Sequence, residues 1–232
     1  MIDPQAVVHP SAQVAADVEI GPFAVVEAEA ELHSGVSVAA QAFVGRGVVV
    51  GAGSRLGVGA VLLAGTRLGP GCRIESGAVL GSSGFGFVFH QGEHVPIPQV
   101  SGVEVGEGVH IGAGTCIDRG TLEPTRIGAG ANIGAQVQLA HNVSIGERTR
   151  IEHQVGLAGS STVGSDCFMG LQAGMAGKAS LGDRSSLAVR GGLLRKTPPD
   201  SDLWGFPARP RSEAMRAQAA LARLAKSTDT QE

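Results

Sequence analysis

Aliphatic residues recur at every sixth position along most of the chain. The first run comprises Val8, Val14, Ile20, Val26, Leu32, Val38, Val44, Val50, Leu56, Leu62, Leu68, Ile74 and Leu80. The period returns at Val105, Ile111 and Ile117, and again at Ile127, Ile133, Leu139, Ile145, Ile151, Leu157, Val163, Met169, Met175, Leu181, Leu187 and Leu193. A period of six is neither the 3.6 of a helix nor the two-residue alternation of a strand, and it is typical of a hexapeptide solenoid.

Each hexapeptide is expected to supply one short strand and one turn, with its aliphatic residue pointing inward. Four positions later stands a small residue, which fits a tight corner. Examples are Ala24, Ala30, Ala42, Ser54, Thr66 and Cys72. Three hexapeptides close a triangular coil, and successive coils stack by parallel strand pairing about 4.8 Å apart. The pattern therefore predicts an all-β solenoid, a parallel β-helix, over residues 1–196.

The period is interrupted at residues 81–104 and again at 118–126. The first insertion reads "GSSGFGFVFHQGEHVPIPQVSG" and contains Phe85, Phe87 and Phe89. Apolar rings in such a loop either line a site or form a hairpin packed on its own coil. The second, "DRGTLEPT", adds four residues between Ile117 and Ile127. Repeat proteins place function at such interruptions.

Residues 197–232 depart from the repeat. A proline-rich bend leads into "SEAMRAQAALARLAK", which has helical composition. We expect a short C-terminal α-helical segment that either caps the open end of the prism or contacts another subunit.

Composition narrows the possibilities further. Glycine contributes 36 of 232 residues and aromatics 3%, while 43% of residues are hydrophobic, so the core is narrow and aliphatic. The net charge is −3, so the chain lacks the excess of basic residues that is typical of nucleic-acid-binding proteins. The start "MIDPQAVVHP" does not look like a secretory signal, and no apolar run reaches a membrane-spanning length, so we expect a cytoplasmic protein without a transmembrane segment.

The three cysteines are far apart and form neither a metal-binding spacing nor a disulfide framework. Cys72 and Cys167 occupy the small inward position, where we expect packing residues and not reactive thiols.

The candidate chemistry lies at His141. This histidine follows the inward Leu139 by two residues, where its side chain is expected to leave the prism. Gly159 comes one coil of three hexapeptides later and is expected to stack beside it. A base next to an unshielded backbone N–H is the pair that acyl transfer requires, because one removes a proton and the other stabilises the oxyanion.

Several motifs in this order resemble the UDP-3-O-acylglucosamine N-acyltransferases of the lipid A pathway. They are "GFGFVF", "VPIPQVSGVEVGEGVHIGAGTCIDRG", "LAHNVSIG", "GLAGS" and "GFPARP". The resemblance implies a left-handed β-helix and a homotrimer with sites between subunits. It also implies transfer of a (3R)-hydroxyacyl chain from acyl carrier protein to the amino group of a UDP-glucosamine-type acceptor.

In this resemblance His141 matches the general base and Gly159 the oxyanion donor. Substrate binding is predicted for Asn142, Gln138, Lys178, Phe85 and Phe87. No metal and no bound cofactor are implied, since the acyl group arrives on the phosphopantetheine arm of acyl carrier protein.

The chain departs from the family pattern in three respects. In family members a uridine-binding domain precedes the repeat. Here the repeat already begins at Val8, so we expect that domain to be lacking. Lys178 stands in place of a second histidine, and Gly134 and Ala135 in place of an Asp-Asn pair. These departures predict an altered acceptor site.

Three other functions are compatible with such a prism. One is a non-catalytic paralogue that binds acyl carrier protein or a full-length homologue. Another is a coenzyme A-dependent sugar N-acetyltransferase. A zinc hydratase is the third, but His141 and His153 lack the close pairing that its metal site requires.

Overall fold

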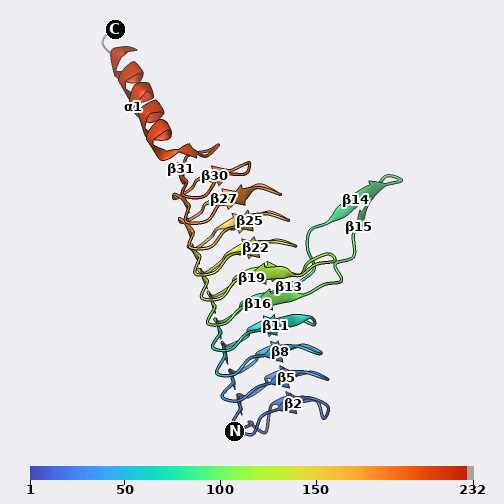
Figure 1. Cartoon of the computed structure of the whole chain (residues 1–232). Coiled ribbons are helices and arrows are strands. Elements are labelled where there is room, and N and C mark those ends of the chain that lie inside the picture. Colours follow the sequence, from blue (N-terminus) through green and yellow to red (C-terminus); the bar gives the residue numbers. More distant parts are fainter. Residues whose placement is uncertain (229–232) are drawn as a thin grey trace.

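The computed structural model describes residues 1–228 and shows a triangular prism of stacked coils (Figure 1). Each face of the prism is one sheet of mainly parallel strands, and successive strands of the chain go to the three faces in turn, apart from a two-stranded hairpin and the last strands. The predicted left-handed parallel β-helix is confirmed.

The first face is a 10-stranded sheet. Its strands are β1 (Val7–Val8), β4 (Val25–Val26), β7 (Phe43–Val44), β10 (Val61–Leu62), β13 (Val79–Ser82), β18 (Cys116–Asp118), β21 (Gln138–Leu139), β24 (Gly156–Leu157), β27 (Gly174–Met175) and β30 (Gly192–Leu193). This face carries the strands that position the candidate site.

The second face has nine strands. They are β2 (Gln13–Val14), β5 (Glu31–Leu32), β8 (Val49–Val50), β11 (Thr66–Leu68), β16 (Val103–Val105), β19 (Thr125–Ile127), β22 (Ser144–Ile145), β25 (Thr162–Val163) and β28 (Ser180–Leu181).

The third face has eleven strands, the last of them antiparallel. They are β3 (Glu19–Ile20), β6 (Ser37–Val38), β9 (Arg55–Leu56), β12 (Arg73–Ile74), β17 (His110–Ile111), β20 (Asn132–Ile133), β23 (Arg150–Ile151), β26 (Phe168–Met169), β29 (Ser186–Leu187), β31 (Asp202–Trp204) and β32 (Arg209–Pro210).

The period of six has the structural basis that the sequence predicts. In most two-residue strands the second residue is buried and the first is more exposed, as in β21, where Gln138 is exposed and Leu139 is buried. The small residues at the corners are buried as well, among them Ala24, Ser54 and Cys72. A prism this narrow leaves no interior space for large rings, which explains the low aromatic content.

The corners depend on a backbone conformation that the hydrophobic pattern does not reveal. The residue three positions after most of the inward aliphatics has a positive φ, for example 59° at Asn142 and 60° at Ser160. In the later coils these positions are occupied by residues other than glycine, which incur a steric cost. Some of them form ladders between coils. In one ladder Gln154 donates to Gln136, Gln172 donates to Gln154, and Arg190 donates to Gln172, over 2.8–3.0 Å.

Buried corner hydroxyls usually satisfy two backbone groups of the next coil. Thr149 Oγ1 donates to Gly164 O over 2.6 Å and accepts from Cys167 N over 3.1 Å. Ser161 is equally buried, but its Oγ has no hydrogen-bond partner. A buried hydroxyl without a partner destabilises the folded state.

We expect Ser161→Ala to raise the free energy of unfolding by about 1 kcal/mol, since it removes the unpaired hydroxyl and leaves no backbone group unsatisfied. The matched change Thr149→Val removes a paired hydroxyl, and we expect it to lower the free energy of unfolding by about 1–2 kcal/mol. Thermal unfolding of both variants beside the wild type measures the difference. If Ser161→Ala lowered the free energy of unfolding more than Thr149→Val does, this interpretation would be contradicted.

The first insertion forms a hairpin that projects sideways from the coils (Figure 1). It consists of β14 (Phe87–His90) paired antiparallel with β15 (Glu93–Pro96). All eight of these residues are exposed. The alternative of a hairpin packed on its own coil is therefore wrong, and only the base of the insertion lies against the prism.

The end of the prism is closed by the bend and not by the helix. Leu203 in β31 pairs with Leu187 of the last complete coil and is buried. The loop that follows covers β30, because Gly192 N donates to Gly205 O and Ala208 N donates to Gly192 O.

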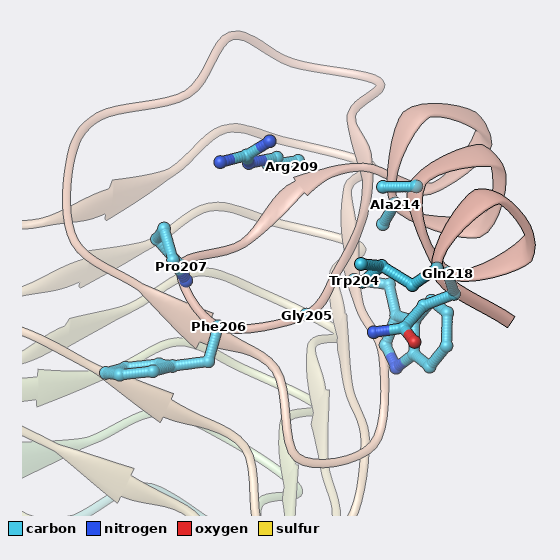
Figure 2. A pocket seen from close by; sticks show the side chains of 9 residues that line it. Trp204, Gly205, Phe206, Pro207, Arg209, Ala214 and Gln218 are labelled. Carbon is cyan, nitrogen blue, oxygen red and sulfur yellow. The ribbon is translucent and has the colours of Figure 1, made fainter. Parts of the chain in front are cut away.

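Helix α1 (Arg211–Thr228) then runs away from the coils (Figure 1), so the expectation that it caps the prism is wrong. It contacts β31 and β32 and leaves Met215 and Leu221 exposed. A cavity of about 290 Å³ lies along this contact, and Figure 2 shows Trp204, Ala214 and Gln218 around it. The predicted C-terminal segment extends to residue 232, and its last four positions lie outside the described residues.

Cys72 and Cys167 are buried, as predicted, and burial raises the pKa of both thiols. Their sulfur atoms contact the backbone oxygens of Gly106 and Gly182, each at 3.1 Å. Within the described chain, α1 falls short of the apolar length that crossing a lipid bilayer demands.

Candidate active site

The half-buried His141 side chain lies between two glycines from different parts of the chain. Gly84 belongs to the loop that follows β13, and Gly159 lies one coil after His141. A Cβ atom added to Gly159 would lie 2.5 Å from His141 Nε2, and one added to Gly84 would lie 2.6 Å from His141 Cβ. Both glycines are therefore required for the ring to occupy this position. The structure brings His141 and Gly159 together as the spacing predicts.

The backbone N–H of Gly159 is a free donor. At the same position of other hexapeptides the N–H donates to a side chain, as Ala135 N does to His153 Nδ1 over 2.8 Å and Ser165 N to Asp183 Oδ1 over 2.8 Å. Within residues 1–228, no acceptor is bonded to Gly159 N. A half-buried N–H without a partner beside an imidazole is a ready donor to an anionic oxygen.

Asn142 determines which nitrogen of His141 carries the proton. Asn142 Nδ2 donates to Glu123 O over 2.7 Å, and Oδ1 accepts from Thr121 N and Thr121 Oγ1 over 3.1 and 2.9 Å. This network orients Oδ1 toward His141 Nδ1, 3.1 Å away. Because an amide oxygen can only accept, we assign the proton to Nδ1, which leaves the lone pair of Nε2 facing Gly159. His141 is thus arranged as a base.

We expect Asn142→Ala to reduce the rate of any reaction that uses this base by about tenfold or more, because the imidazole loses the acceptor that fixes its tautomer. Nitrogen-15 NMR of the imidazole should show a shift from the Nδ1–H form toward the Nε2–H form. A merely structural role would leave that tautomer ratio unchanged. A wild-type ring found in the Nε2–H form would contradict the assignment.

Asp118, at the end of β18, is a buried carboxylate in this site that the sequence analysis did not select. It is 7% exposed. Ser82 Oγ donates to its Oδ1 over 2.8 Å, and Gln138 Nε2 donates to its Oδ2 over 3.3 Å. Burial raises its pKa, while the two hydrogen bonds and the nearby His141 lower it. The available signal was its place as the first residue of the second interruption of the repeat.

A cavity of about 400 Å³ opens beside these groups. Its lining includes Gly84, Phe85, Phe87, Gln99 and Asp118. The rings of Phe85 and Phe87 meet edge to face at 5.0 Å. These two rings and His94 border a further hollow of about 490 Å³. The site thus combines polar groups at its base with an apolar surface on the insertion.

The structure places the remaining predicted residues on the same side of the prism. Gln138 bonds to Asp118, as described above. Lys178 is exposed at the same corner as Asn142 and Ser160, and its N–H donates to Gly159 O over 3.2 Å. Two coils, about 10 Å, separate it from Asn142. Lys178 is therefore too far from His141 to share its proton.

The described residues contain no group of three or more His, Cys, Asp or Glu side chains placed to hold a metal ion.

Comparison with known protein families identifies the repeat. Residues 124–159 match a model described as bacterial transferase hexapeptide (six repeats), and residues 47–82 and 97–119 match one described as hexapeptide repeat of succinyl-transferase. These three segments of the chain are therefore similar to known hexapeptide repeats. The matched residues of the first model end at Gly159 and include His141.

Curated relatives of this chain confirm the resemblance over the repeat region. The chain is 53% identical over 74 residues to a UDP-3-O-acylglucosamine N-acyltransferase of Shewanella denitrificans, which is 32% of this chain and 22% of that protein. It is 49% identical over 72 residues to the protein of the same name from Pseudomonas syringae pv. syringae, which is 31% and 20% of the two chains. The matched part thus spans about a fifth of the length of these relatives.

Solved structures with this fold include a UDP-N-acetylglucosamine O-acyltransferase from Moraxella catarrhalis, with a TM-score of 0.68 and 20% identity over 94% of this chain and 77% of the other. The Arabidopsis UDP-N-acetylglucosamine acyltransferase also gives a TM-score of 0.68, with 21% identity and the same coverage. At these identities the likeness concerns the fold of the chain and not its reaction.

Proposed function

We propose that this protein is an acyltransferase that moves a (3R)-hydroxyacyl chain from acyl carrier protein to the amino group of a UDP-glucosamine-type acceptor in lipid A biosynthesis. The observation that carries the proposal is the contact between the His141 ring and Gly159, whose N–H has no partner in the described chain. The names of the curated relatives support the reaction class.

The geometry supports a direct transfer between the two substrates. His141 Nε2 removes a proton from the acceptor nitrogen as that nitrogen attacks the thioester carbonyl. The carbonyl oxygen becomes an oxyanion and accepts a hydrogen bond from Gly159 N–H. Collapse of this intermediate expels the thiolate, which takes the proton back from His141. The products are an amide and the free thiol of the phosphopantetheine arm, and His141 is regenerated.

The surroundings of His141 suit a long acyl donor. Phe85 and Phe87 present apolar surface next to Gly84, and we assign them to contact with the acyl chain or the acceptor. Lys178, about two coils further along the corner, is exposed and can pair with a phosphate of the donor arm. Asn142 and Gln138 act through the polar network at the base of the cavity.

We further propose that the protein functions as a homotrimer in the cytoplasm. The hairpin of β14 and β15 supports a contact between copies, because Val88, Phe89 and Val95 are 52%, 66% and 42% exposed far from their own coils. Light scattering should give three times the 23.4 kDa of one chain. A monomer at working concentration would contradict this part of the proposal.

The test of the proposed reaction is direct. Purified protein is incubated with (3R)-hydroxyacyl carrier protein and UDP-3-O-acylglucosamine, and amide formation is followed by mass spectrometry. The proposal predicts release of free carrier thiol with one amide formed per thiol. Acetyl-coenzyme A in place of the carrier tests for an N-acetyltransferase. Transfer from acetyl-coenzyme A alone, or no transfer from either donor, would contradict it.

A further inference from the structure

Asp118 is a buried carboxyl group that forms no ion pair with a lysine or arginine of the described chain. Its two hydrogen-bond donors, Ser82 Oγ and Gln138 Nε2, are neutral. Among the residues that the structure describes, no lysine or arginine forms an ion pair with it. Removing a carboxylate from water is costly unless a positive charge compensates it.

The nearest arginine in sequence does not supply that charge. Arg119 Nε donates to Gly81 O over 2.7 Å, and its Nη2 donates to Ala64 O over 2.9 Å. Its guanidinium is therefore committed to the backbone of the preceding coils. The carboxylate of Asp118 is left facing the cavity of about 400 Å³, whose wall includes Gly84, the residue in contact with His141.

We propose that Asp118 binds the protonated amino group of the acceptor, and that this contact selects amines over hydroxyls. The inference rests on the proposed function and deepens it. An amino group near electron-withdrawing substituents is largely protonated at neutral pH, with a pKa of about 8 for the comparable α-amino group. As an ammonium it offers a positive charge and three N–H donors to a carboxylate whose two hydrogen-bond donors are neutral.

The proton balance of the reaction is consistent with this contact. The bound ammonium first loses one proton through Asp118 to solvent, and the neutral amine then attacks the thioester carbonyl. The second proton passes to His141 Nε2 and from there to the departing thiolate. The third remains on the nitrogen of the amide. A hydroxyl acceptor brings no positive charge and would leave the Asp118 carboxylate unpaired.

The experiment compares two acceptors that differ at one group. Binding of UDP-3-O-acylglucosamine and of its counterpart with a hydroxyl in place of the amino group is measured by calorimetry near pH 7. We expect the wild type to bind the amine at least about tenfold more tightly than the hydroxyl counterpart, because a hydrogen-bonded charge pair contributes about that much to the affinity. Asp118→Asn should reduce this preference to less than about threefold. Equal binding of both acceptors by the wild type would overturn the inference even if the variant does not fold.

Two controls separate the possible failures. Asp17→Asn changes an exposed carboxylate in the first coil, between β2 and β3, and should keep the preference. Asp166→Asn, at an exposed carboxylate that pairs with Arg148, should keep it as well. If the wild type forms amide but Asp118→Asn retains the full preference, the inference alone fails. If the wild type acylates no amine, the proposed function is wrong, and the inference, which rests on it, is wrong as well.

Discussion

His141→Ala lowers kcat/KM for amide formation by about a thousandfold, the middle of the range that a general base contributes. The loss is large because the fixed tautomer leaves Nε2 as the base beside the free Gly159 N–H. We expect KM for the acyl donor to change little, since the ring acts on the attacking nitrogen. Steady-state kinetics with both substrates varied provides the measurement.

The matched control is His33→Ala. His33 is an exposed histidine in an early coil, 3.8 Å from Glu31, and it does not contact the site. Its replacement is expected to leave kcat/KM within about twofold of the wild type, as is usual for exposed positions. Equal activities of His141→Ala and the wild type would show that another group is the base.

Gly159→Ala lowers kcat by about a hundredfold through a single methyl group. The new Cβ would lie 2.5 Å from His141 Nε2, a distance that forces the ring to move. A displacement of about 1 Å at a reacting group is enough for a loss of that size. Rates under saturating substrates, together with thermal unfolding to confirm the fold, measure the effect.

Gly156 offers a control in the same coil. A Cβ added there meets no atom within 4 Å, so Gly156→Ala should retain nearly full activity. Comparable losses in the two glycine variants would mean that the coil as a whole, and not the space beside His141, controls the rate.

The sequence predicts the prism well because one physical constraint repeats along it. A narrow interior accepts one aliphatic residue and one small residue per hexapeptide, so residues such as Leu139 and Ala24 reveal the fold by their period alone. The pairing of His141 with Gly159 follows from the same arithmetic, since Gln138 of β21 pairs with Gly156 of β24.

The rest of the site depends on contacts that have no period. Gly84 and Gln99 reach the site from the base of an insertion whose path the repeat does not constrain. Asp118 gains its significance only from burial and from the lack of an ion pair with any described lysine or arginine. The helix was expected either to cap the prism or to contact another subunit. It does not cap the prism, because Leu203 and the loop after it already cover the last coil.

The most direct test of the central contact is a double-mutant cycle between His141 and Gly159. If the methyl group of Gly159→Ala acts by displacing the ring, it has nothing to displace once His141 is alanine. We predict that Gly159→Ala lowers kcat by about a hundredfold in the wild type and by less than about threefold in the His141→Ala background. The same hundredfold loss in both backgrounds would contradict the account.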